Sequence, residues 1–234
     1  MKFPLVIELV GYPGAGKTTL VSLLRERKPY DNLVARETHN SSSRRCLVTK
    51  LYRHLVWSIM CARSLGWSNF FNIYRILILM MIYEPHKRQI LRSSYALGAM
   101  WYACPLNQSL IIDQGLLVWL GSWASKKRDY WIDKLLPYLS SYHVVPLLCE
   151  VSYERSLERL KTRTSSTWSL QDRQLRGTLY ADSLSHVLSS YTREHRQILY
   201  KISTEWSLEA SYAALCQKIE EILLRYCSIK KERS

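Results

Sequence analysis

The residues from Gly11 to Thr19, "GYPGAGKTT", combine glycines, a lysine and two threonines in a spacing that suits phosphate binding. Gly11, Gly16, Lys17 and Thr18 satisfy the pattern GxxxxGK[ST]. Glycines let backbone N–H groups converge on a phosphate, the lysine reaches the β and γ phosphates, and the threonine hydroxyl can bind Mg²⁺. The sequence therefore predicts an ATP-binding loop made of Gly11, Tyr12, Pro13, Gly14, Ala15, Gly16, Lys17, Thr18 and Thr19.

A carboxylate for the metal ion is expected at the end of a neighbouring strand, because Mg²⁺ prefers oxygen ligands. The run "SLIIDQ" is an apolar strand that ends in Asp113, so we expect Asp113 and Thr18 to hold Mg²⁺. The alternative is an aspartate that caps a helix or a turn. Gln114 follows, where many motor-type ATPases have a glutamate that activates water, and there is no NKxD guanine signature. Both absences disfavour a motor ATPase and a GTPase.

Three arginines further along, Arg155, Arg159 and Arg163, recur at the helical spacing of four and share one predicted helix face. A polar loop with Arg173 and Arg176 follows them. Arginines on a closing segment can stabilise the charge that develops on a transferred phosphoryl group. The alternative is a solvated helix whose arginines pair with neighbouring glutamates, and the periodicity by itself favours that alternative.

The elements that must position these residues alternate between strands and helices. Short β-branched and apolar runs predict five strands, at residues 4–10, 33–38, 109–114, 143–151 and 198–204. Helical patterns cover residues 18–26, 47–63, 73–83, 87–102, 130–142, 152–163, 179–196 and 207–227. This alternation is typical of an α/β fold with a parallel sheet covered on both faces.

Length and composition limit the remaining choices. The chain has 234 residues, 47% of them apolar, which is enough for one core, and we expect a single domain over residues 1–234. The formal charge of +14 suits an anionic ligand without choosing among a nucleotide, a nucleic acid and a phospholipid surface. Six cysteines show no CxxC pair and no zinc spacing, which indicates a reduced, cytoplasmic compartment. Neither long apolar run, at 70–83 or 93–112, offers the roughly 20 predominantly apolar residues of a membrane span.

The ordered set of motifs resembles P-loop kinases of the thymidylate kinase and deoxynucleoside kinase type. The phosphate loop matches generally, "ARET" (residues 35–38) resembles the family's "REP", and "IIDQG" stands where the family has "DRY". "ERLKTR" is similar to the entry of the family's lid. "ILYKISTEWSLEASYAALCQKIEEIL" is similar to its last strand, adenine-side loop and closing helix. The resemblance spans nearly the whole chain and is weak residue by residue outside the phosphate loop.

This resemblance implies a three-layer P-loop NTPase fold, with a five-stranded parallel sheet of order 2-3-1-4-5 and helices on both faces. ATP would lie on the loop, and the acceptor would lie across the sheet edge under a lid at about residues 155–178. Glu37 would contact the acceptor or serve as its base, with Arg36 beside the phosphates, and Arg159 and Arg163 would take the lid role. The alternative for Glu37 is a strand-end acid paired with a basic residue. Because "THN" replaces the residues after "RE" of the family motif, and Gln114 replaces the arginine of "DRY", thymidylate itself is disfavoured.

We therefore expect an ATP- and Mg²⁺-dependent kinase that acts on a small hydroxyl- or phosphate-bearing molecule, with nucleosides and nucleotides the leading class. Two alternatives stay open: a kinase of a nucleic acid or an RNA-linked group, and a regulator that binds nucleotide without an acceptor. A homodimer is also left open. Trp119, Trp123 and Trp131 are candidates to lie near the acceptor, although aromatic residues at helical spacing more often belong to a core.

Overall fold

The computed structural model describes residues 5–31, 33–36, 67–84, 109–113, 115–121, 127–139, 144–161 and 170–232. Within these segments the strands are β1 (Val6–Val10), β2 (Leu33–Arg36), β3 (Ser109–Ile112), β4 (Val144–Glu150) and β5 (Tyr200–Ser203). The helices are α1 (Lys17–Arg27), α3 (Trp67–Tyr83), α5 (Leu116–Gly121), α6 (Arg128–Leu135), the 3₁₀ turn η1 (Leu136–Leu139), α7 (Tyr153–Lys161), α8 (Leu170–His195) and α9 (Leu208–Glu232).

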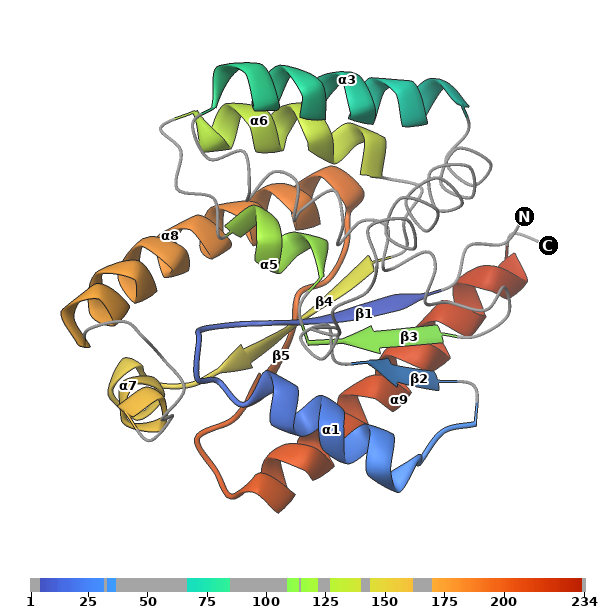
Figure 1. Cartoon of the computed structure of the whole chain (residues 1–234). Helices are drawn as coiled ribbons and strands as arrows, with labels where there is room; N and C mark the ends of the chain where they lie inside the picture. The colour runs from blue at the N-terminus through green and yellow to red at the C-terminus, as the bar shows by residue number, and fades with distance from the viewer. Residues whose placement is uncertain are drawn as a thin grey trace, which may run out of the picture.

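The five strands form one parallel sheet in the order β2-β3-β1-β4-β5 (Figure 1). β1 is central, since Val6 lies opposite Leu110 of β3 on one side and Val144 of β4 on the other. All five residues of β1 are buried, as expected for a strand in a parallel sheet that helices cover on both faces. The α/β class expected from the alternation of strands and helices and the strand order expected from the resemblance are both confirmed.

Each face of the sheet carries its own hydrophobic core, because successive side chains of a strand point to opposite faces. Ile7 and Leu9 of β1 pack with apolar residues of α1 and α9. Val6 and Val10 pack on the other face with residues of α3, α5, α6 and α8. Glu8 lies between Val6 and Val10 in the strand, so its carboxylate enters this second core. The three-layer arrangement is visible in Figure 1.

Helix α3 forms an outer layer over α6 (Figure 1). Its buried side chains are Ile73, Leu77 and Met80. The indole N–H of Trp131, in α6, donates a hydrogen bond of 2.8 Å to Glu84 just after α3. Trp131 therefore belongs to the core between these helices, as the packing alternative for the tryptophans stated.

The boundaries of several helices differ from those expected. The sequence pattern does not predict helix α5, "LLVWLG", because the helix is apolar on all sides and so has no amphipathic period. Five of its six residues are buried. Helix α8 begins at Leu170, nine residues before the expected start, and the helix expected to reach residue 142 becomes a 3₁₀ turn after Leu135. The helices expected at 47–63 and 87–102 lie outside the described residues. Within the described segments no helix is long and apolar enough to cross a membrane.

Candidate functional site

The predicted phosphate-binding loop at residues 11–19, called the phosphate loop below, joins β1 to α1 through a backbone that requires glycine. Gly11 and Gly14 have φ values of +143° and +91°, which L side chains rarely adopt. A Cβ atom on Gly11 would lie 2.5 Å from the carbonyl oxygen of Cys149, and one on Gly14 would lie 2.7 Å from that of Ser156. The loop is therefore packed closely between β4 and α7, and its backbone path depends on these two glycines.

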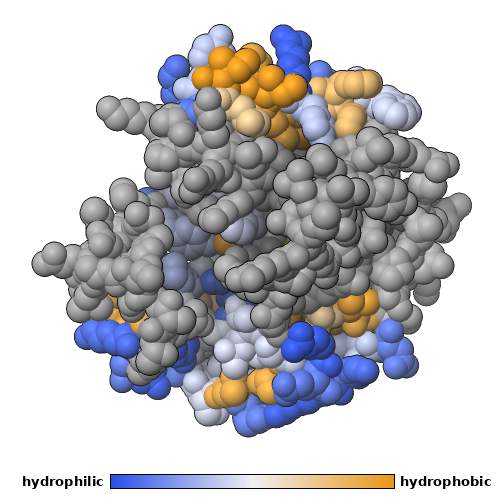
Figure 2. Space-filling model, viewed as in Figure 1, coloured by the Kyte–Doolittle hydropathy of each residue, from blue (hydrophilic) through white to orange (hydrophobic). Residues whose placement is uncertain are grey.

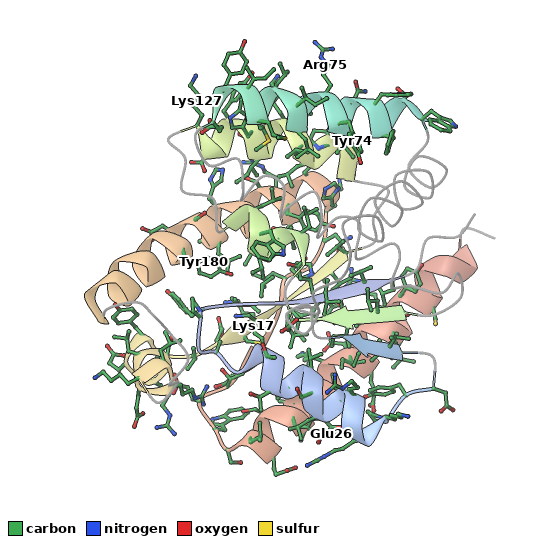
Figure 3. The ribbon with its side chains drawn as sticks, in the orientation of Figure 1. Lys17, Glu26, Tyr74, Arg75, Lys127 and Tyr180 are labelled. Carbon is green, nitrogen blue, oxygen red and sulfur yellow. The ribbon has the colours of Figure 1, made fainter. Side chains whose placement is uncertain are left out.

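Lys17 opens α1 and is buried, with 8% of its surface exposed. Its ammonium group donates hydrogen bonds of 2.7 Å to the carbonyl oxygen of Gly11 and 2.8 Å to that of Tyr12. A buried charge needs such partners, and here they belong to the loop itself. The positive charge is consequently held inside the turn. Figure 3 shows Lys17 where β1 passes into α1.

Thr18 and Asp113 meet although 95 residues separate them. The Thr18 hydroxyl donates a hydrogen bond of 2.8 Å to an oxygen of the Asp113 carboxylate, and Asp113 has no exposed surface. Asp113 directly follows β3, which pairs with β1, so the parallel sheet brings both groups to its carboxyl edge. The two oxygen-bearing side chains expected to hold a metal ion are adjacent.

Helix α7 packs against the phosphate loop. The Ser156 hydroxyl donates a hydrogen bond of 2.6 Å to the carbonyl oxygen of Pro13. One turn later, the guanidinium of Arg159 donates a hydrogen bond of 2.6 Å to the carbonyl oxygen of Thr204, just after β5. A guanidinium nitrogen of Arg159 also lies 3.9 Å from the place that a Cβ on Gly16 would occupy. Arg159 therefore lies between the phosphate loop and the end of β5.

The other arginines are placed differently. The guanidinium of Arg155 is exposed and pairs with Glu158 at 2.6 Å, so this residue follows the solvated-helix alternative. Arg163, Glu37 and Gln114 lie outside the described residues, as do the side chains of Arg36 and of residues 170–179. The expected lid at about 155–178 is thus described only in α7 and in the backbone at the start of α8.

Glu8 is a buried acid that was not among the expected site residues. One carboxylate oxygen accepts hydrogen bonds from the N–H groups of Gly115 (3.0 Å) and Val118 (2.8 Å). The other oxygen accepts one from Leu117 (3.1 Å). Burial raises the pKa of Glu8 from 4.5 to about 7, and these hydrogen bonds limit the rise. The signal in the sequence was a single charged residue inside the otherwise apolar strand "VIELV".

Side chains for other kinds of metal site do not gather in the described segments. No group of three or more His, Cys, Asp or Glu residues in these segments is placed to hold a metal ion. Cys149 lies next to Gly11 of the phosphate loop, and burial raises the pKa of its thiol to about 12, although Lys17 partly opposes the rise. Since a thiol with a raised pKa is a poor nucleophile, Cys149 has a packing role.

No protein-family model matches the sequence, and no curated protein is similar enough to be matched. Among solved structures, the chain is similar to deoxyadenosine kinase from M. mycoides with bound dATP, with a TM-score of 0.52 and 15% sequence identity over 92% of this chain and 100% of that one. A structure of deoxyadenosine kinase from M. mycoides with bound dCTP has a TM-score of 0.49 at 13% identity, over 93% of this chain and 100% of that one. The chain has a deoxynucleoside kinase-like P-loop kinase fold.

Proposed function

We propose that the protein transfers the γ-phosphoryl group of ATP, with Mg²⁺, to a small hydroxyl- or phosphate-bearing acceptor. The observation that carries this proposal is the hydrogen bond between Thr18 and Asp113 beside the phosphate loop and its buried lysine. A loop that served only to join a strand to a helix would need neither a buried ammonium group nor a buried carboxylate at the same edge of the sheet.

Different groups among the described residues would bind different parts of ATP, the phosphoryl donor. The backbone N–H groups of the loop and the N-terminus of α1 would receive the phosphates, and Lys17 would reach the β and γ oxygens. The Thr18 hydroxyl and the Asp113 carboxylate are oxygen ligands of the kind that Mg²⁺ prefers, so they fit the metal ion. Bound there, Mg²⁺ would neutralise charge on the phosphates. Arg159 would approach the phosphates from α7.

The reaction proposed is an in-line displacement at phosphorus. An oxygen of the acceptor forms a bond to the γ-phosphorus while the bond from that phosphorus to the β–γ bridging oxygen breaks, and ADP leaves. Where the acceptor is a hydroxyl group, its proton passes to a base. We assign this base to Glu37, because the family resemblance implies that this residue would contact the acceptor or serve as its base, and we assign charge stabilisation on the closing side to Arg163 and Arg159.

Nucleosides and nucleotides are the leading acceptor class in this proposal. Support comes from the motif resemblance and from the similar fold of a deoxyadenosine kinase that holds dATP. A kinase of a nucleic acid or an RNA-linked group is a less favoured alternative that the charge of +14 allows. A nucleotide-binding regulator without an acceptor is the third candidate.

We also propose that residues 1–234 form one domain with a lid at about 155–178. The protein would work in the cytoplasm, where free thiols such as those of Cys149, Cys216 and Cys227 stay reduced.

A homodimer is part of the proposal, because the outer face of α3 is apolar. Trp67, Phe71, Ile78 and Ile82 of this helix are more than half exposed and recur at spacings of four and seven residues. Figure 2 shows the resulting apolar patch at the edge of the molecule, and Figure 3 shows Arg75 pointing outward from the same helix. A stripe with this period suits packing against a second helix, and a two-fold dimer would pair the stripe with its own copy.

The proposal is tested by ATP turnover measured with and without candidate acceptors in the presence of Mg²⁺. Candidates come from a metabolite library screened for a rise in melting temperature with an ATP analogue bound, since a specific ligand stabilises the folded chain by mass action. We expect ADP formation to require one such small molecule, with a nucleoside or nucleotide the most effective. Turnover that depends only on added RNA or DNA would favour the nucleic-acid alternative, and binding without any turnover would favour the regulator.

Lys17→Ala is the matched control for this test. The variant should lose most of the turnover, because the charge that faces the β and γ phosphates is removed. Its folded state is checked by circular dichroism, since the carbonyl oxygens of Gly11 and Tyr12 also lose a partner. A folded Lys17→Ala protein that transfers phosphate at nearly the unmodified rate would refute the kinase assignment.

A further inference from the structure

Glu8 stands out among the buried acids of the described residues because its partners adjoin the candidate metal site. The side chain has no exposed surface and lies between Val6 and Val10 on the face of β1 that packs against α5 and α8. Among the described residues, the phenols of Tyr180 and Tyr191 in α8 interact electrostatically with Glu8. A lone acid in such surroundings is costly to bury, so its hydrogen bonds are essential to its placement.

The groups that Glu8 binds belong to the start of α5. The first N–H groups of a helix have no partner inside the helix, and here the Glu8 carboxylate accepts from Gly115, Leu117 and Val118 at 3.0, 3.1 and 2.8 Å. The approach is close enough to need glycine, because a Cβ on Gly115 would lie 2.5 Å from a carboxylate oxygen of Glu8. One side chain of β1 therefore fixes the backbone from residue 115 to residue 118.

This fixed segment begins two residues after Asp113. Asp113 is held on its other side by the hydroxyl of Thr18 at 2.8 Å. Glu8 also lies directly opposite Ile112 in the register of β1 and β3, so the end of β3 and the start of α5 are both attached to the same point of the central strand. The backbone that carries Asp113 is thus attached on both sides of that residue, by strand pairing before it and by the Glu8 carboxylate after it.

We infer that Glu8 is a positioning residue for Asp113: its carboxylate holds the start of α5 so that the Asp113 carboxylate meets the Thr18 hydroxyl at the metal-binding edge of the phosphate loop. The inference rests on the proposed function for the role of Asp113 and adds a residue to it. The hydrogen bonds of the Glu8 carboxylate go to backbone N–H groups at the start of α5, so its effect on Mg²⁺ passes through that backbone.

Glu8→Gln is the informative substitution because it keeps the size of the side chain and changes one acceptor into a donor. The new NH₂ group would face one of the three backbone N–H groups, so at least one hydrogen bond is lost. Glu84→Gln is the matched control. Glu84 is also a buried acid, with 7% of its surface exposed, but it binds the indole of Trp131 between α3 and α6, away from the phosphate loop.

The primary measurement is the affinity for the ATP analogue AMP-PNP, by calorimetry, with Mg²⁺ and with EDTA. The gain in affinity that Mg²⁺ provides should fall about 10-fold or more in Glu8→Gln, the range seen when a group that orients a metal ligand is changed. It should stay at the unmodified level in Glu84→Gln. In an Asp113→Asn background, where the metal ligand is already impaired, Glu8→Gln should have no further effect on this gain.

Three results would overturn the inference: an unchanged Mg²⁺ gain in Glu8→Gln, an equal loss in Glu84→Gln, or an equal additional loss in the Asp113→Asn background. If Glu8→Gln does not fold, Gly115→Ala takes its place, because the added methyl group displaces the same contact while leaving the acid intact. Its Mg²⁺ gain should fall as well, and an unchanged value would contradict the inference.

Amide hydrogen exchange separates this inference from the proposed function. Exchange at Gly115, Leu117 and Val118 should be faster in Glu8→Gln than in the unmodified chain and in Glu84→Gln, whether or not nucleotide is bound. Absence of AMP-PNP binding by the unmodified chain would refute the proposed function. Unchanged exchange at these three amides in Glu8→Gln would refute the attachment of α5 by Glu8 in either case.

Discussion

The pH dependence of folding stability should reveal the ionisation of Glu8. Burial raises the pKa of this carboxyl from 4.5 to about 7, so between these values the folded chain binds a proton that the unfolded chain has released. The free energy of unfolding then decreases as the pH rises, because stability falls with pH wherever the folded state binds more protons. The contribution is fully present below pH 4.5 and is lost by about one unit above pH 7.

The size of the effect follows from the two pKa values. A difference of 2.5 units corresponds to about 3.4 kcal/mol in total, and the part that falls between pH 5 and pH 8 is about 2.5 kcal/mol. Glu8→Gln cannot release this proton. The free energy of unfolding of the unmodified chain, minus that of Glu8→Gln, should therefore decline by roughly 2.5 kcal/mol over this range. The carboxyl is buried, so salt in the solvent screens the effect only weakly.

Urea unfolding at pH 5, 6, 7 and 8, followed by circular dichroism, measures this difference. Other titrating groups cancel when the two proteins are subtracted, including His195, whose pKa burial lowers. The phenols of Tyr180 and Tyr191 cancel as well, since burial raises the pKa of both. A difference that stays constant within about 0.5 kcal/mol across the range would refute the reasoning. It would mean that the three N–H donors of α5 outweigh the cost of burying the charge and keep Glu8 ionised throughout.

The remaining predictions concern the phosphate loop, the lid and the outer helix. Gly14→Ala should lower the free energy of unfolding by about 1–3 kcal/mol in urea titrations, which is more than Gly16→Ala should lower it. Both glycines have a positive φ, but only a Cβ at Gly14 would meet a backbone atom. Equal losses of stability in the two variants would contradict this prediction. Arg163→Ala should lower kcat and kcat/KM together, by up to about 10³ in steady-state assays, with little change in melting temperature; Arg155→Ala, whose guanidinium pairs with Glu158 in solvent, should stay near the unmodified rates. If Arg163 instead binds a nucleic acid, its loss would reduce the salt dependence of binding by about one counterion, and unchanged kinetics with an unchanged salt slope would mean that the lid is misplaced. Phe71→Glu on the exposed face of α3 should convert a dimer into a monomer in sedimentation experiments, and a monomeric unmodified chain would refute the dimer.

Much of the fold was predictable because the signals are local and repeat along the chain. The five apolar runs predicted five strands, and each described strand lies within the predicted range and covers two or three residues fewer. The strand order was an expectation from the resemblance, and the sheet confirms it. Helix α5 was not predictable in this way, because a six-residue run without polar positions carries no period that separates a helix from a buried strand.

The sequence by itself determined the phosphate loop, because the conformation of the loop depends on glycines within a few residues of Lys17. It also predicted Asp113 at the carboxyl edge, since parallel strands end at the same side of a sheet. Only the tertiary structure decided the partners that lie far apart in the chain. The helical spacing of four gave the same prediction for Arg155 and Arg159, which was one shared helix face. In the structure, Arg155 pairs in solvent with Glu158, whereas Arg159 donates a hydrogen bond to the carbonyl oxygen of Thr204, 45 residues away.

The hydrogen bonds of Glu8 show why local features were predictable from the sequence and distant partners were not. The place of Glu8 in β1 puts its side chain on one face of the sheet, and there the cost of burying a carboxylate is offset by N–H groups more than 100 residues later, at the start of a helix that has no polar positions of its own. Local sequence determines which conformations a segment can adopt. Which distant groups satisfy a buried charge depends on packing of the whole sheet and its helices, and that is decided only when the chain has folded.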